Sequence, residues 1–318
     1  MSALLEIRDL AVRFRQGAER VDALIGVSFE VGRGERVAVV GESGSGKTLS
    51  SLAAMHLLPD AAEIAGGTIA FDGEDIAAAP ERRMRALRGR RMAMVFQNAA
   101  HSLNPLLTVG QQIADIHRQH HGGSRAAAWE RAVAALEATG IPDAPNRARL
   151  YPHEYSGGMA QRAMIAMALT CRPDLLIADE PTSGLDVTIQ RQVLDLIREV
   201  TDETGAALIL ITHDIAQIPG NCSRVVVMYG GMVMENGEAD LVLSRPANPY
   251  TAALLACAAP VSGEFPHIPG RAPDPRHRPP GCPFAPRCAH VGERCRTERP
   301  GLRPHERRLV ACHFPVMS

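Results

Sequence analysis

Short runs of apolar residues recur along the first 255 residues, and their lengths indicate strands. Residues 4–7, 11–14 and 27–31 have the length and composition of strands near the start of the chain. Later runs are continuously apolar, which is typical of parallel strands buried on both faces; they are residues 37–40, 175–178, 207–211 and 225–228. This pattern predicts a sheet with buried parallel strands.

Two other stretches have the composition of helices. Residues 48–58 follow a glycine-rich turn, and Pro59 ends this predicted helix. Residues 126–139 are rich in alanine with apolar residues at helical spacing, and Gly140 can cap the C-terminus. Residues from about 98 to 170 are mostly helical in pattern. Because strands alternate with helices, the sequence predicts an α/β fold.

The composition changes after about residue 256. Nine prolines lie within residues 260–286, so long helices are not expected there. This segment is either a disordered tail or a small module that something other than an apolar core holds together. We therefore expect a nucleotide-binding domain over residues 1–255, with a helical subdomain at about 98–170, and a separate C-terminal module over residues 256–318.

Composition and charge exclude some classes of protein. The 318 residues are 46% hydrophobic and 22% charged, which is ordinary for a soluble globular protein. The formal net charge is −1, so no general affinity for nucleic acid is expected. No apolar run reaches the roughly 18 residues of a membrane span, and the first residues do not resemble a secretory signal. The chain is expected in the cytosol, with any membrane attachment through a partner.

A phosphate-binding loop follows the predicted strand at residues 37–40. The segment GESGSGKT matches G-x-x-x-x-G-K-[ST] and runs into a predicted helix. Its glycines let backbone N–H groups approach a triphosphate, Lys47 reaches the β- and γ-phosphates, and Thr48 offers a hydroxyl to Mg²⁺. The predicted ATP-binding residues of this loop are Gly41, Ser43, Gly44, Ser45, Gly46, Lys47 and Thr48.

Two adjacent carboxylates end the predicted strand at residues 175–178. Asp179 and Glu180 come at its carboxyl end, where ligands bind in open α/β sheets. Asp179 is the candidate for orienting Mg²⁺, and Glu180 could activate the attacking water as a general base. An Asp-Glu pair after a strand is more often a helix cap, but its distance after a phosphate-binding loop favours the catalytic interpretation.

A second glycine-containing turn narrows the choice among families that have a phosphate-binding loop. Ser156, Gly157 and Gly158 precede an apolar helical stretch and can form the N-terminal phosphate nest of that helix. With the QR that follows, the segment resembles the signature motif of ABC ATPases. The resemblance implies a P-loop ABC ATPase fold, with a mixed sheet and a helical subdomain. It also implies that this turn binds the ATP held by a partner subunit.

The resemblance assigns further residues in the order that the family has them. Gln97 corresponds to the glutamine that senses Mg²⁺ and relays to the membrane subunit. Asp186 lies in the loop that communicates across the dimer, and His213 is the switch histidine near the γ-phosphate. Phe14 is similar to the aromatic residue that stacks on adenine, although a core position is nearly as compatible with it.

Several stretches resemble the group of dipeptide, oligopeptide and nickel permeases. These are residues 102–105, 151–154, 185–190 and 248–251, together with the cysteine-rich end. The chain departs from the family pattern at Tyr155, Ala160, Gly184 and residues 98–99. None of these departures removes a phosphate-contacting or catalytic group.

Four cysteines cluster near the C-terminus. Cys282, Cys288, Cys295 and Cys312 have the spacing C-x5-C-x6-C-x16-C, and a reducing cytosol favours a metal over disulfides. Four thiolates suit an iron–sulfur cluster or zinc equally on chemical grounds. The segment around Cys282 and Cys288 resembles the C-terminal module of peptide permeases, some of which carry a [4Fe–4S] cluster; zinc and unligated thiols are the alternatives.

The resemblance implies a function. We expect an ATPase subunit that powers the import of dipeptides or oligopeptides, with nickel, opines, glutathione or another small solute as alternative cargo. The expected partners are two transmembrane permease subunits, a second ABC ATPase subunit that is a different chain or a second copy, and indirectly an extracytoplasmic solute-binding protein. The expected place is the cytoplasmic face of the cell membrane.

Two other functions agree less well with the sequence. A soluble ABC ATPase of DNA repair or translation would carry a long coiled-coil insertion or two fused cassettes, and the sequence has neither. A non-catalytic cassette would have lost catalytic groups, whereas Lys47, Asp179, Glu180 and His213 are all present.

Overall fold

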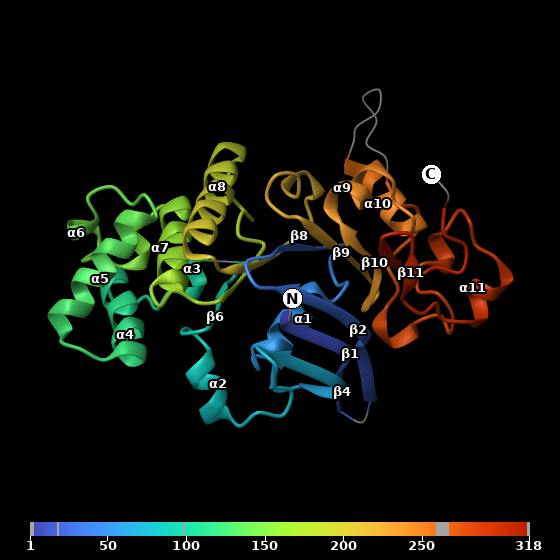
Figure 1. Ribbon diagram of the computed structural model, residues 1–318, viewed down its shortest axis with the longest axis horizontal. Helices are drawn as coiled ribbons and strands as arrows, with labels where there is room; N and C mark the ends of the chain where they lie inside the picture. The colour runs from blue at the N-terminus through green and yellow to red at the C-terminus, as the bar shows by residue number, and fades with distance from the viewer. Residues whose placement is uncertain (1–2, 18, 98, 259–266, 317–318) are drawn as a thin grey trace. The chain divides into compact units, whose positions relative to one another are not determined.

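The computed structural model describes residues 3–17, 19–97, 99–258 and 267–316 (Figure 1). The chain forms two compact units, one made of residues 1–78 and 211–318 and the other of residues 79–210. This division joins the C-terminal module to the N-terminal strands and gives the second unit more than the helical stretch. The domain boundaries near residues 98, 170 and 255 therefore stay predictions.

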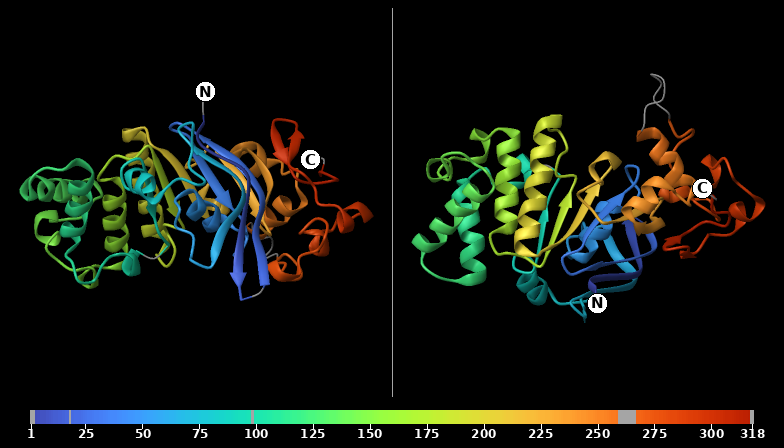
Figure 2. Two further views of the ribbon diagram at one scale, coloured as in Figure 1. Left: turned by 90° about the horizontal axis from the view of Figure 1, so that it is seen from below. Right: turned by 45° about the horizontal axis from the view of Figure 1, so that its top comes forward.

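The first unit contains an antiparallel sheet with the strand order β2-β1-β4-β5. Its long strands β1 and β2 pair along most of their length (Figure 2). The strands are β1 (Ala3–Gln16), β2 (Glu19–Gly32), β4 (Ala62–Phe71) and β5 (Glu74–Asp75). The sequence pattern suggested two strands in place of β1. They form one strand because a bulge near Asp9, whose φ is 49°, shifts the pairing register between the two apolar runs.

The first unit also contains strands of a second sheet, some paired parallel and others antiparallel. β3 pairs parallel with β9, and β9 pairs antiparallel with β10. The strands are β3 (Arg36–Val40), β9 (Arg224–Tyr229), β10 (Met232–Glu238), β11 (Arg303–His305) and β12 (Arg308–Val310). The predicted strands at residues 37–40 and 225–228 are confirmed, and both are buried. The sheet is mixed, as expected.

The helices of the first unit are short. They are α1 (Lys47–Ala54), α9 (Ala239–Ser244), α10 (Pro249–Ala258) and α11 (Glu293–Thr297). Helix α1 ends four residues before the predicted end at residue 58. The reason is His56, which takes a left-handed conformation with φ 51° and binds the carbonyl oxygen of Ile76 through its ring at 2.6 Å.

The second unit combines a layer of helices with parallel strands. Helices α4, α5 and α7 pack against one another, as Figure 2 shows, and β6 pairs parallel with β7. The elements are α2 (Glu81–Leu87), β6 (Met92–Val95), α3 (Ala99–Ser102), α4 (Val109–His121), α5 (Arg125–Ala138), α6 (Ala144–Arg147), α7 (Gly157–Leu169), β7 (Leu175–Asp179), α8 (Val187–Thr204) and β8 (Ala207–Thr212). Helix α5 lies within one residue of its prediction, and Gly140 follows its last residues with φ 72°.

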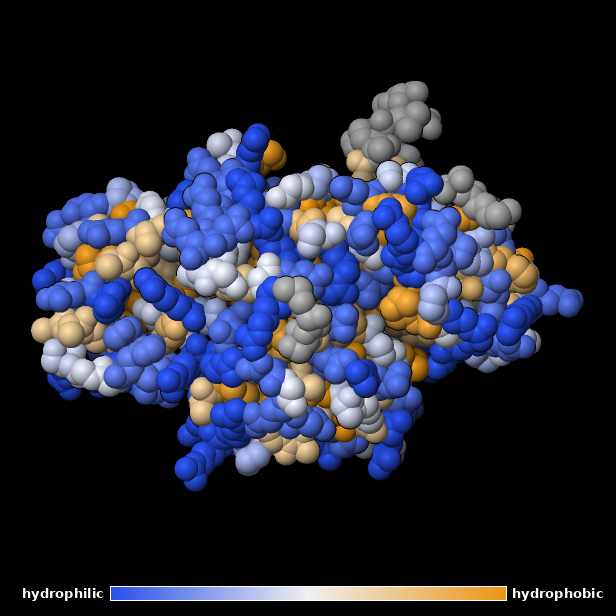
Figure 3. Space-filling model, viewed as in Figure 1, coloured by the Kyte–Doolittle hydropathy of each residue, from blue (hydrophilic) through white to orange (hydrophobic). Residues whose placement is uncertain are grey.

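The surface carries no large apolar region on the face shown in Figure 3, where apolar side chains form small separate groups. Among the described residues, no helix has both the length and the apolar composition needed to cross a bilayer.

Candidate functional site

The phosphate-binding loop connects β3 to α1 in the first unit. Gly41 has φ 151°, and a Cβ there would lie only 2.1 Å from the carbonyl oxygen of Met228. Only glycine fits, because no side chain can enter the space between the loop and β9. The last loop residue, Gly46, is the N-cap of α1 with φ 102°. The loop is therefore fixed against the sheet at one end and opens the helix at the other.

Two polar side chains of the loop face inward. The Lys47 ammonium donates to the carbonyl oxygens of Gly41 at 2.8 Å and Glu42 at 3.1 Å, and the side chain is buried. Ser45 is 2% exposed, and its hydroxyl has no hydrogen-bond partner among the described residues. Because a buried polar atom without a partner is costly, this hydroxyl fits a loop built to receive a polar ligand.

The loop is held from outside by residues that are distant in sequence. The backbone N–H of Glu42 donates to the Tyr250 hydroxyl at 2.9 Å, and the Glu42 carboxylate accepts from Arg287 at 2.8 Å. Arg287 also donates to the Tyr229 hydroxyl at 3.0 Å. The Arg287 side chain is only 6% exposed and lies against the ring of Phe284. No local sequence pattern predicts these contacts.

The aromatic residues around Arg287 form a compact cluster. The rings of Tyr229, Tyr250 and Phe284 have centroids 4.4 to 5.3 Å apart. Burial raises the pKa of both tyrosine hydroxyls, so they are neutral at physiological pH. A neutral hydroxyl can accept the N–H of Glu42 while its ring stays in the apolar cluster.

The predicted catalytic carboxylates lie in the second unit, at the end of β7. Asp179 is the last strand residue and is 4% exposed. Glu180 follows with φ 44°, an unusual backbone conformation for a non-glycine residue. Its carboxylate accepts a hydrogen bond from the Gln97 side-chain amide at 2.7 Å. The structure thus brings together two predicted site residues that are 83 positions apart.

The predicted signature turn and dimer loop also meet in the second unit. Ser156 is the N-cap of α7 and accepts from the N–H of Met159, and Asp186 caps α8 through the N–H of Ile189. A Cβ on Gly158 would lie 3.1 Å from a methyl group of Ile189, so the two helix starts are in contact. Ser156 and Gly157 are exposed, which leaves the turn open to a ligand from outside the chain.

Phe14 and His213 belong to the first unit. Phe14 lies in β1, half-buried, opposite Val21 and Ala62 in the neighbouring strands. His213 is exposed and directly follows β8, as predicted. The site residues are therefore divided between the two units.

The four C-terminal cysteines line one small cavity. It measures about 20 Å³ and is lined by Cys282, Cys288, Cys295 and Cys312 with His290 and His313. Burial, together with the charges of the other three cysteines, raises the pKa of Cys282 to about 11, although a hydrogen bond from the N–H of Phe284 opposes this shift. The number and type of ligands fit a metal site. Among the described residues, however, no group of three or more His, Cys, Asp or Glu side chains is arranged to hold a metal ion.

Comparison with known families identifies the nucleotide-binding fold. The sequence model of the family described as "ABC transporter" matches residues 24–183, about half of the chain. The chain belongs to this family. A second model, "Oligopeptide/dipeptide transporter, C-terminal region", matches residues 234–295. The protein is accordingly an ABC ATPase, which uses ATP and Mg²⁺, and the predicted family and activity are confirmed.

Relatives of this ABC ATPase match along nearly its whole length. The oligopeptide transport ATP-binding protein OppD of Salmonella typhimurium is 44% identical, with 99% of this chain and 95% of the relative covered. The dipeptide transport ATP-binding protein DppD of Escherichia coli is 42% identical (99% and 97% covered). The oligopeptide transport ATP-binding protein AppD of Bacillus subtilis is also 42% identical (98% and 97% covered).

Solved ABC structures share the fold. The bacterial ABC transporter cassette MJ0796, solved as a dimer, superposes with a TM-score of 0.67 at 25% identity and covers 74% of this chain and 98% of its own. The cassette cbiO1 of Clostridium perfringens gives a TM-score of 0.65 at 27% identity, with 77% and 92% covered. The predicted ABC ATPase fold is confirmed.

The contacts of Arg287 generate a prediction about stability. Arg287→Met would leave the Glu42 carboxylate and the Tyr229 hydroxyl without their shared partner in a largely buried position. We expect a loss of about 2 kcal/mol in the free energy of unfolding, measured by denaturation. Arg294→Met is the control because Arg294 pairs with Glu298 on the surface, where water screens the pair and its loss should change stability little. Equal effects of both substitutions would contradict the prediction.

Proposed function

We propose that this protein is the ATP-hydrolysing subunit of a dipeptide or oligopeptide importer, attached to two permease subunits at the cytoplasmic face of the membrane. The relatives that match nearly the whole chain are named as oligopeptide and dipeptide transport proteins, which supports the choice of cargo. The hydrogen bond between Gln97 and Glu180 is the observation that carries the mechanism. It ties the proposed general base to the residue proposed to relay to the permease.

In this proposal the loop of residues 41–48 holds the phosphates of ATP. The Lys47 ammonium, which now rests on the carbonyl oxygens of Gly41 and Glu42, supplies positive charge to the β- and γ-phosphates. The hydroxyl of Ser45 gains the hydrogen-bond partner that it lacks among the described residues. Phe14 offers its ring to adenine. This assigns nucleotide binding to the domain of residues 1–255.

Hydrolysis is assigned to Glu180. Its carboxylate takes a proton from the attacking water, while the Gln97 amide fixes its orientation. Asp179 and Thr48, with Gln97, are the proposed protein ligands of Mg²⁺, which neutralises charge on the phosphates when bound. His213 is proposed to bind near the γ-phosphate.

A second ABC subunit completes the proposed site. Ser156 and Gly157 are exposed and Gly158 is half-buried at the start of α7, where backbone N–H groups and the helix dipole favour an anion. They would bind the ATP held by the opposite subunit, with Asp186 beside them. That subunit is a homologous chain or a second copy of this one.

The helical stretch at residues 98–170 is the proposed contact with the permease. Leu106 is 82% exposed on a turn after Gln97, an unusual position for a large apolar residue in a monomer. The N–H of Val109 donates to the carbonyl oxygen of Leu150, so the exposed Tyr151 belongs to a segment next to this turn. Two exposed apolar side chains near the proposed relay residue fit a protein–protein contact.

The C-terminal module over residues 256–318 is proposed to carry a [4Fe–4S] cluster. All four cysteines line one cavity, yet they are not arranged around a single ion. Four thiolates suit such a cluster chemically, and the resemblance of this module to that of peptide permeases favours a cluster over zinc. The small cavity means that the side chains must open outward to receive it. When bound, the cluster would cross-link the segments that carry Cys282 and Cys312.

The proposed role of Glu180 predicts that its replacement impairs ATP hydrolysis without impairing ATP binding. Glu180→Gln keeps the side-chain size but removes the base, so steady-state ATPase activity should fall by at least about 100-fold. Binding of a fluorescent ATP analogue should change little. The control Glu199→Gln alters an exposed carboxylate on α8 and should leave both unchanged. ATPase activity retained in Glu180→Gln would reject Glu180 as the base.

The permease contact predicts a transport defect without an ATPase defect in the isolated subunit. Leu106→Asp should abolish peptide uptake by reconstituted transporter vesicles, because a charge would be buried in the contact. ATP hydrolysis by the purified subunit alone should be unchanged. The control Leu106→Met preserves the apolar surface and should retain peptide uptake. Normal uptake with Leu106→Asp would place the contact elsewhere.

The proposed [4Fe–4S] cluster predicts the iron and sulfide content of anaerobically purified protein. We expect about four iron and four sulfide ions per chain with a visible charge-transfer band. Cys288→Ser should lower the iron content, whereas Cys257→Ser, a cysteine outside the cavity, should not. Stoichiometric zinc would instead make the module a zinc clip. Absence of any metal, with four titratable thiols, would reject the site.

A further inference from the structure

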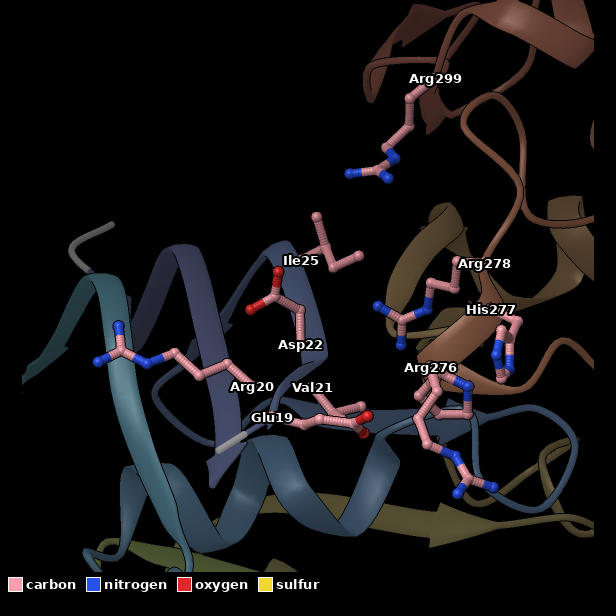
Figure 4. Close-up of a pocket in the computed structure, with 10 residues that line it drawn as sticks. Glu19, Arg20, Val21, Asp22, Ile25, Arg276, His277, Arg278 and Arg299 are labelled. Carbon is pink, nitrogen blue, oxygen red and sulfur yellow. The ribbon is translucent and has the colours of Figure 1, made fainter. Parts of the chain in front are cut away.

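A second cavity lies in the first unit between β2 and the C-terminal segment. It has a volume of about 520 Å³, within the range of small-molecule sites. In Figure 4, Asp22 and Ile25 come from β2, and Arg278 and Arg299 face them from the C-terminal segment. The lining includes no residue of the loop at residues 41–48, so this cavity is separate from the proposed phosphate site.

Positive charge predominates in this cavity. The lining contains four arginines and two carboxylates. Asp22 already pairs with Arg13 at 2.6 Å, and Arg276 pairs with Asp274 at 3.1 Å. Among the described residues, the other three arginines of the lining have no carboxylate partner; they are Arg20, Arg278 and Arg299. Glu19 alone does not balance them.

Arg278 is the least satisfied of these side chains. One terminal nitrogen donates to the carbonyl oxygen of Ala23 at 3.0 Å, but Nε and the other terminal nitrogen are buried without a partner. Burial lowers the pKa of Arg278, and the charge of Arg299 lowers it further, while only Asp22 opposes them. A buried guanidinium with unpaired donors beside a second cation destabilises the fold unless an anion binds there.

We propose that this cavity binds the phosphate group of a small phosphate monoester, held between Arg278 and Arg299. A phosphate monoester carries a charge near −2 at pH 7, which balances two guanidinium groups, whereas a carboxylate balances one. The planar guanidinium matches phosphate oxygens in pairs. The cavity is much larger than inorganic phosphate, so the rest of the ligand occupies the space along Val21 and Ile25.

The cavity is connected to the phosphate-binding loop through one glycine. The N–H of Gly231 donates to the carbonyl oxygen of Ser45 at 3.0 Å, and its own carbonyl oxygen accepts from Ile25 at 2.9 Å. A Cβ on Gly231 would lie 2.9 Å from Arg278 and 2.1 Å from the carbonyl oxygen of Ala23. Arg278 therefore lies directly beside Gly231, whose backbone supports the phosphate-binding loop at residues 41–48.

Binding to the full chain tests the site. Isothermal titration calorimetry would be performed with glucose 6-phosphate, ribose 5-phosphate and glucose, in a Lys47→Ala background that weakens phosphate binding at residues 41–48. None of these probes carries the adenine base that Phe14 is proposed to bind. We expect one site for each phosphorylated probe and none for glucose.

Arg299→Gln provides the decisive comparison. Arg299 is exposed and has no hydrogen-bond or ion-pair partner among the described residues, so its replacement should leave folding intact, as circular dichroism would verify. We expect about tenfold weaker binding, the loss typical of one charge-assisted hydrogen bond. The matched control Arg296→Gln removes an exposed arginine outside the cavity and should have no effect. Equal affinities in both variants, or no binding of either phosphorylated probe, would overturn the proposal. Because ATP hydrolysis is not the readout, this result is independent of the proposed function.

Discussion

The organisation of the first unit depends on the hydrogen bonds that Glu42 makes through its backbone and its side chain. Its N–H donates to Tyr250, its carboxylate accepts from Arg287, and its carbonyl oxygen accepts from Lys47. A glycine-rich loop loses much conformational entropy when it becomes ordered, so it needs external contacts to keep one shape. Here two of the three contacts come from beyond residue 248. The C-terminal part of the chain thus helps to order the loop.

A buried polar network places Tyr250 and Arg287 where they can do this. Asn248 donates to the carbonyl oxygens of Met234 and Ala311 and accepts from the N–H of Tyr250. Glu235 is fully buried and accepts from the N–H groups of Ala247 and Asn248. Arg308 supplies the matching charge to Glu235 at 3.1 Å.

Because Asn248, Glu235 and Arg308 each bond to several partners, the network favours a single arrangement, although the Arg308 Nε has no partner among the described residues. It links β10 to the residue before Cys312 and to Tyr250, which bonds to the loop. A change at the cysteine cavity therefore has a short structural route to the loop, although a route by itself does not demonstrate energetic coupling.

The sequence predicted the features that depend on local chemistry. The loop at residues 41–48, the caps at Ser156 and Gly140, and the carboxylates after β7 are each encoded within a few neighbouring residues. The pairing of Gln97 with Glu180 needed the family resemblance, because 83 positions separate them. The contact of Arg287 with Glu42 spans 245 positions and has no local signature, so only the folded chain could reveal it.

Unsatisfied buried polar atoms occur in both proposed binding regions of the first unit, although Ser51, Asn221, Thr251 and Arg308 also carry such atoms. A folded protein pairs nearly all its buried polar groups, since each unpaired one costs about 1 to 3 kcal/mol. The Ser45 hydroxyl and the Arg278 guanidinium both break this rule, and each lies in a setting that suits a phosphate. The Glu235–Arg308 pair is just as polar and more deeply buried, and its two side chains bond to each other although the Arg308 Nε has no partner among the described residues. Neither burial of charge nor a missing partner therefore marks a site alone; the surroundings must also suit a ligand.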